Sequence, residues 1–138
     1  MNDSSVSVAK IAQILDLKNF TDNIELKKIK ITSSDVNRPA LQLTGYFEHF
    51  EQSRIQMIGN VEYAYIQQMN DEEKRIRYSA FLQFEIPCVI FCRDLQPDAI
   101  FIEQAEKNHV PILGTSRPTS EFMAELIYTL AEKLAPCI

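Results

Sequence analysis

The sequence predicts an α/β fold in which a small mixed or mainly parallel sheet is flanked by helices. The main indication lies in the last third of the chain, where apolar runs alternate with helical patterns. The stretches "PCVIFCR" (87–93) and "VPIL" (110–113) are continuous apolar runs, as expected of strands covered on both faces. A helical pattern follows each run, and this alternation indicates parallel, right-handed βαβ units.

The first half of the chain adds a helix and three short strands. Apolar residues at 8, 11, 12 and 15 predict an amphipathic helix that Ser7 caps. Alternation of apolar and polar residues then predicts strands around 29–31, 41–43 and 54–59.

Four further helices are predicted from residue 61 onward. The first covers 61–69 after a capping Asn60, and the second begins at Asp71 with acids in its first turn. The inward stripe expected for the second helix is Ile76, Ala80 and Phe84. The other two helices cover 96–109 and 119–135.

Thr119 is the predicted cap of the last helix. Its expected buried face is Phe122, Leu126, Leu130 and Leu134. The chain contains no repeat, linker or low-complexity segment, so residues 1–138 are predicted to form one domain.

Composition argues against several classes of partner. The net charge is −5, and nucleic acid is not expected as a partner because phosphate binding needs a basic face. No apolar run approaches the roughly 18 to 20 residues that span a bilayer, and the amino terminus does not resemble a secretory signal. A cytoplasmic location and no membrane contact are therefore expected.

The cysteines predict neither a disulfide nor a metal site. Cys88 and Cys92 lie four residues apart on a predicted strand, which places their Cα atoms about 13 Å from each other. Their C-x3-C spacing has no second Cys or His pair beside it, so zinc binding is not expected. The two histidines, His49 and His109, have no partner at catalytic or metal-binding spacing.

Glycine is scarce, which excludes the common nucleotide loops. The three glycines are Gly45, Gly59 and Gly114, and none is followed five residues later by the second glycine of a P-loop. A dinucleotide fingerprint is excluded for the same reason. The sequence therefore predicts no catalytic, cofactor-binding or metal-binding residue.

One joint between a strand and a helix remains a weak candidate for an anion site. It consists of Gly114, Thr115, Ser116 and Arg117, which precede a helix whose free amides and dipole attract anions. An ordinary strand-to-helix joint is the favoured reading of the same residues.

A second stretch, 33–59, contains a conspicuous loop. Asp35 is placed to turn the chain, and Arg38 is held extended by the proline after it. Arg38 can pair with Asp35 and brace the loop, or it can bind an external anion. Bracing is the favoured interpretation.

The motif run "ITSSDVNRPALQLTGYFEHFEQSRIQMIGNVEYAYI" resembles the amino-terminal domain of the HPr kinase/phosphorylase family. The stretches "IPCVIFCRDLQP" and "VPILGTSRPTSEFMAELIYTLAEKLAP" extend the resemblance over essentially the whole chain. The residues that form the family-signature loop are Asp35, Arg38, Pro39, Thr44, Gly45 and Tyr46.

The resemblance implies a fold similar to the amino-terminal domains of muramyl-peptide ligases. It also implies a hexameric, bifunctional enzyme that phosphorylates and dephosphorylates a serine of HPr in bacterial carbon catabolite regulation. In that family ATP and Mg²⁺ bind a carboxy-terminal P-loop kinase domain, which is absent from this chain.

This chain is therefore expected to be a non-catalytic accessory domain with a regulatory or partner-contact role. Its expected partners are the carboxy-terminal kinase domain and HPr. The alternative is a small-molecule or nucleotide-sensing module that uses Arg38, Thr44 and the joint at 114–116.

Overall fold

A computed structural model describes residues 4–135 of the chain. In chain order the elements are β1 (Val6–Ser7), α1 (Val8–Ile14), β2 (Lys18–Asn19), the 3₁₀-helix η1 (Leu26–Lys28), β3 (Lys30–Ile31), β4 (Val36–Asn37), α2 (Ala40–Leu43), β5 (Ile55–Ile58), α3 (Asn60–Gln67), α4 (Asp71–Leu82), β6 (Val89–Phe91), α5 (Ala99–Lys107), β7 (Ile112–Gly114) and α6 (Thr119–Leu134).

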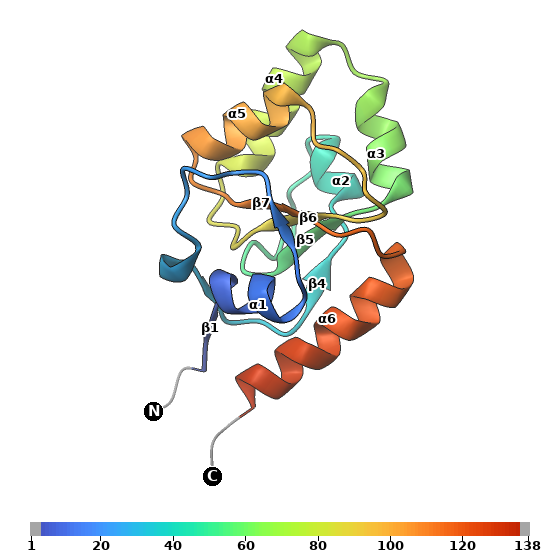
Figure 1. Ribbon diagram of the computed structural model, residues 1–138. Helices are drawn as coiled ribbons and strands as arrows, with labels where there is room; N and C mark the ends of the chain where they lie inside the picture. The colour runs from blue at the N-terminus through green and yellow to red at the C-terminus, as the bar shows by residue number, and fades with distance from the viewer. Residues whose placement is uncertain (1–3, 136–138) are drawn as a thin grey trace.

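The main sheet has five strands in the order β2-β7-β6-β5-β4, and β1 pairs with β3 in a separate two-stranded sheet. Strands β4 to β7 are parallel neighbours in chain order, whereas β2 is antiparallel to β7. Successive right-handed crossovers in one direction place their helices on one face of a sheet. Helices α2 to α5 accordingly cover one face, and α1 and α6 cover the other (Figure 1). The predicted α/β class with a mainly parallel, mixed sheet is confirmed.

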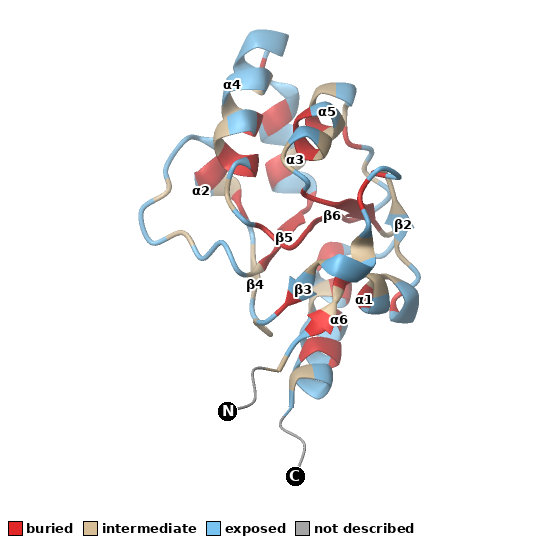
Figure 2. Ribbon diagram, turned by 90° about the vertical axis from the view of Figure 1, so that its left-hand side faces the viewer, coloured by how far each residue is buried: buried red, intermediate tan, exposed pale blue. Residues whose placement is uncertain are grey.

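Alternate strand residues point into two separate cores. Ile55 and Met57 of β5 pack with α1 and α6, whereas Ile58 packs with the helices of the opposite face. The strands between these cores are buried on both sides, and β5 and β6 appear as a red layer in Figure 2. Burial on both faces explains the continuous apolar runs in the sequence.

Several local predictions are confirmed. The side chain of Ser7 caps α1 by accepting a hydrogen bond from the amide of Lys10 at 3.0 Å. Strands β5, β6 and β7 lie within the predicted ranges. On α6, the expected face is buried at Phe122, Leu126 and Leu130, and Leu134 packs partly buried against the same core.

The predicted strand at 41–43 is wrong, because these residues form helix α2. An alternation over three residues does not distinguish a strand from one helical turn, and the Thr44-Gly45 pair is a helix-ending signal. The predicted inward stripe of α4 is also wrong. Ile76 is 59% exposed, whereas Tyr78, Phe81 and Leu82 are the buried residues of that helix.

Two predicted caps lie one position too late. Gly59 precedes α3, so Asn60 is its first helical residue. Pro118 precedes α6, so Thr119 is likewise inside the helix, and no side chain caps that end. Both helices therefore begin with first-turn amides that no cap residue satisfies.

Neither Cys88 nor Cys92 forms a disulfide, and both are buried; Cys137 lies outside the described residues. Burial raises the pKa of the Cys88 thiol to about 12. Burial also raises the pKa of the Cys92 thiol to about 11, and the neighbouring Thr119 opposes this shift. Both groups are therefore protonated thiols at neutral pH. Among residues 4–135, no helix is long and apolar enough to cross a membrane.

Candidate functional site

The candidate site lies at the edge of the sheet where the parallel strands end. Strand β4 is followed by Arg38 and strand β5 by Gly59, and helices α3 and α6 both begin at this edge. Strand ends and helix amino termini that meet in this way are the usual place for ligands in parallel α/β sheets. We call the group of Arg38, Gly59, Glu62 and Thr119 the carboxyl-edge site.

A buried ion pair forms one half of the carboxyl-edge site. The Nε and Nη2 groups of Arg38 donate to the two carboxylate oxygens of Glu62 at 2.9 and 2.7 Å. The amide of Gly59 donates to the same carboxylate at 2.9 Å. The Glu62 side chain is 3% exposed, whereas that of Arg38 is 36% exposed. Glu62 is the third residue of α3, the position from which an acid reaches back to the residue before the helix.

Thr119 and Gly59 form the other half. Thr119 is 7% exposed, and its hydroxyl has no hydrogen-bond partner in the described part of the chain. A Cβ atom on Gly59 would lie 2.7 Å from that hydroxyl and 2.8 Å from Nη2 of Arg38. Glycine is therefore required at 59 because the start of α6 and the Arg38 guanidinium both approach it closely.

A polar network fixes the backbone beside this site. The side-chain amide of Asn37 donates to Gln56 at 2.6 Å and to Gln42 at 3.2 Å. The Gln56 side chain donates in turn to the carbonyl of Arg54 at 2.9 Å. Strand β4 is thereby joined to β5 and to α2, which holds Arg38 in position between them.

The structure separates the residues of the predicted signature loop. Arg38 pairs with Glu62, so the predicted Asp35–Arg38 brace is wrong; Asp35 instead lies 3.6 Å from Arg54 in an exposed ion pair. Pro39 precedes α2. The hydroxyl of Tyr46 donates to Glu48 at 3.2 Å.

Thr44 and Gly45 end helix α2. The hydroxyl of Thr44 donates to the carbonyl of Leu41 at 2.6 Å. Gly45 has φ of +97°, and its amide and that of Tyr46 donate to Gln42 and Leu41, respectively. This is a Schellman motif, in which glycine is favoured because a side chain strains the left-handed backbone. Thr44 and Gly45 are thus explained by the helix end.

The weak anion candidate is largely occupied by contacts within the protein. A Cβ on Gly114 would meet the Phe20 ring at 2.7 Å, so Gly114 allows Phe20 to pack. Thr115 accepts at its hydroxyl from the Arg117 amide, and Arg117 forms an ion pair with Glu125. Ser116 is exposed. These contacts agree with the favoured reading of an ordinary joint, and anion binding at 114–117 stays a prediction.

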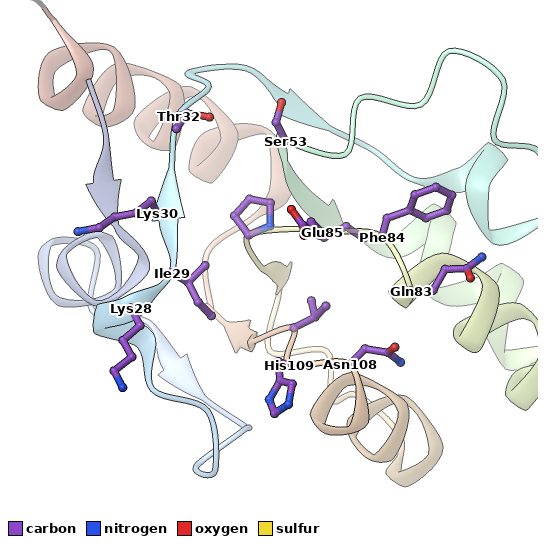
Figure 3. A pocket seen from close by; sticks show the side chains of 13 residues that line it. Lys28, Ile29, Lys30, Thr32, Ser53, Gln83, Phe84, Glu85, Asn108 and His109 are labelled. Atoms are coloured by element: carbon purple, nitrogen blue, oxygen red, sulfur yellow. The ribbon is translucent and has the colours of Figure 1, made fainter. Parts of the chain in front are cut away.

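The opposite end of the sheet carries a cleft of about 530 Å³ (Figure 3). Lys28 and Lys30 line one side, and Gln83 and Phe84 line the other. The two lysines turn their ammonium groups away from its centre, so they do not concentrate positive charge inside it. No residue of the signature loop lines this cleft. Within residues 4–135, no cluster of three or more His, Cys, Asp or Glu side chains is arranged to hold a metal ion.

Sequence reasoning missed Glu62 and Thr119 as members of the site. Glu62 carried a signal, because an acid three residues after Gly59 has the spacing of a capping interaction. Thr119 was assigned as a cap, and nothing in the sequence indicates that its hydroxyl is buried without a partner.

The fold and the site together define an α/β domain with a braced carboxyl edge. The family model described as HPr Serine kinase N terminus matches residues 6–130. The HPr kinase/phosphorylase of Lachnoclostridium phytofermentans is 43% identical over 134 residues, which cover 97% of this chain and 43% of the relative. That of Caldanaerobacter subterraneus is 41% identical over 133 residues, with coverages of 96% and 43%. The chain belongs to the HPr kinase amino-terminal domain family, and it spans less than half the length of these curated relatives.

A solved structure supports the fold alone. The CBS and DRTGG domains of the regulatory region of Clostridium perfringens pyrophosphatase, complexed with the activator diadenosine tetraphosphate, match with a TM-score of 0.58 at 19% identity. The match covers 88% of this chain and 45% of that chain. The predicted similarity to muramyl-peptide ligases stays a prediction.

Proposed function

We propose that this chain is a non-catalytic accessory domain of an HPr kinase/phosphorylase, with a regulatory or partner-contact role. The observation that carries the proposal is the use of its glycines. Gly45 ends α2, Gly59 admits Arg38 and Thr119, and Gly114 admits Phe20. A P-loop needs glycines whose amides wrap around the phosphates of ATP, and these three are separated and individually committed to packing.

The chemistry of the whole protein then lies in the length that the relatives have beyond their match to this chain. ATP and Mg²⁺ would bind a carboxy-terminal kinase domain there, and the substrate would be a serine of HPr. That kinase domain and HPr are the proposed partners, and a hexamer and a cytoplasmic location are proposed for the whole protein.

The test is an activity measurement on the chain alone. Purified chain is mixed with ATP, Mg²⁺ and HPr, and both ADP release and phospho-HPr are measured. The proposal expects no turnover above a reaction without protein. Phospho-HPr formed in proportion to the amount of chain would refute the non-catalytic role.

A small-molecule-sensing role is the second candidate, and the unpartnered hydroxyl of Thr119 favours it. A DRTGG domain in the regulatory region of another enzyme, whose structure was solved with a nucleotide activator, agrees with such a role. Of the residues first considered for it, Thr44 is occupied by its bond to Leu41, whereas Arg38 stays partly exposed. A thermal-shift screen of anions and nucleotides separates this candidate from a purely partner-binding domain.

A further inference from the structure

The start of helix α6 offers hydrogen-bond donors that nothing in the described chain uses. The hydroxyl of Thr119 is buried without a partner, and no side chain caps the amides of the first turn. A buried polar group without a partner is unfavourable and uncommon in folded proteins. The helix is 16 residues long, so its amino terminus carries the full partial positive charge of a helix dipole.

A second helix terminus and a cation lie against the same hydroxyl. Gly59, which precedes α3, has no side chain to cap that helix, and Thr119 approaches it closely. Nη2 of Arg38 lies within 2.8 Å of the point where a Gly59 Cβ would be, and the hydroxyl of Thr119 lies within 2.7 Å of it. Two helix amino termini, a hydroxyl and a guanidinium therefore converge on one place.

The charges around this place are mixed. Glu62 neutralises Arg38 through the bidentate pair, and Glu121 lies in the first turn of α6. Arg93 follows β6 in a left-handed conformation, and its charge acts on the neighbouring Cys92 thiol together with that of Arg38. An anion at this edge would thus compete with Glu62 for the Arg38 guanidinium.

We propose that the carboxyl-edge site binds the phosphate group of a small phosphorylated molecule. One phosphate oxygen accepts from the Thr119 hydroxyl and from the first-turn amides of α6. Arg38 moves off Gly59, which uncovers the hydroxyl, and places its guanidinium on the phosphate. A single phosphate needs no glycine loop of the kind that wraps the triphosphate of ATP. The proposal rests on the accessory function above, because it names the class of molecule that such a domain would sense.

The test is a titration of the chain with inorganic phosphate at constant ionic strength, followed by amide NMR. Saturable shifts are expected at Gly59, Thr119, Ser120 and Glu121, and sulfate and chloride serve as comparison anions. No saturable shift at these amides up to about 50 mM phosphate would overturn the proposal, because weaker binding has no bearing at cellular concentrations. Shifts spread evenly over the surface would overturn it as well.

Two matched variants locate the binding. Thr119→Val removes the hydroxyl at constant shape and should weaken phosphate binding about tenfold, since hydrogen bonds to charged groups are the strong ones. Thr129→Val is the same change on the same helix, at a residue 8% exposed, and should leave binding unchanged. Equal affinities of the two variants would contradict the proposal, and thermal unfolding of each confirms that it is folded.

A third variant tests the competition. Glu62→Gln releases Arg38 and should strengthen phosphate binding, whereas unchanged or weaker binding would show that Arg38 plays no part. Absence of phosphate binding would leave the accessory role intact. Turnover of HPr by the chain alone would refute that role and leave the phosphate site to be judged by the titration.

Discussion

Replacing Arg38 by methionine removes the partner of a carboxylate that cannot reach water. The Glu62 side chain is 3% exposed and would keep one hydrogen bond, from the amide of Gly59. Breaking a buried ion pair by removing one partner costs about 3 to 5 kcal/mol. Because one hydrogen bond remains, we expect the lower end, a loss of about 3 kcal/mol in the free energy of unfolding.

The reverse substitution should cost less. In Glu62→Gln the stranded group is the Arg38 guanidinium, which is 36% exposed and can turn toward water. The glutamine oxygen can still accept from Gly59, so we expect a loss of about 1 kcal/mol. For a domain of this size the two losses correspond to falls of about 10 and 3 °C in Tm.

Urea denaturation followed by circular dichroism measures both values. Arg54→Met is the matched control, because Arg54 pairs with Asp35 at 3.6 Å in an exposed pair and should lose less than about 0.5 kcal/mol. The reasoning is refuted if Arg38→Met costs no more than Arg54→Met. It is also refuted if Glu62→Gln costs more than Arg38→Met.

Three further substitutions or measurements test other parts of the structure. Gly45→Ala places a Cβ at a φ of +97° where the Arg77 guanidinium lies, and should lose about 1 to 2 kcal/mol in denaturation experiments; an unchanged midpoint contradicts the assigned helix end. In a Cys137→Ser background, Cys88 and Cys92 should not react with a thiol reagent at pH 8 until the chain unfolds. Because their folded pKa values lie above the unfolded value near 9, stability should fall as pH rises from about 9 toward 11, and a flat profile contradicts their burial. Ile76→Lys should change stability by less than about 0.5 kcal/mol, and a larger loss would restore the stripe that the structure replaces.

Sequence periodicity predicted the buried face of α6 but not that of α4. Helix α6 packs on an open face of the sheet, so its stripe at Phe122, Leu126 and Leu130 follows one helical row. Helix α4 has two apolar rows, and the correct one contains Tyr78, whose polar end argues against burial in the sequence. The hydroxyl of Tyr78 donates to Asp98 at 2.8 Å, and this partner from the next helix makes burial possible.

The candidate site shows a similar division. The loop of Arg38 and the three glycines stand out in the sequence, and their scarcity predicted that no P-loop exists. The partner of Arg38 lies 24 residues away, on a helix whose position is fixed by the crossover from β5. Local spacing does not determine such a contact, and the unpartnered hydroxyl of Thr119 follows from packing at Gly59 alone.

The most direct test of the accessory role uses a longer relative. The HPr kinase/phosphorylase of Lachnoclostridium phytofermentans is prepared whole and without the segment that aligns with this chain, which covers 43% of its length. ATP-dependent formation of phospho-HPr is then compared at equal protein concentration. The account predicts that the shortened protein still transfers phosphate to HPr, at a rate that can differ through lost regulation. Complete loss of phosphotransfer in a shortened protein that remains folded and still binds ATP would contradict it.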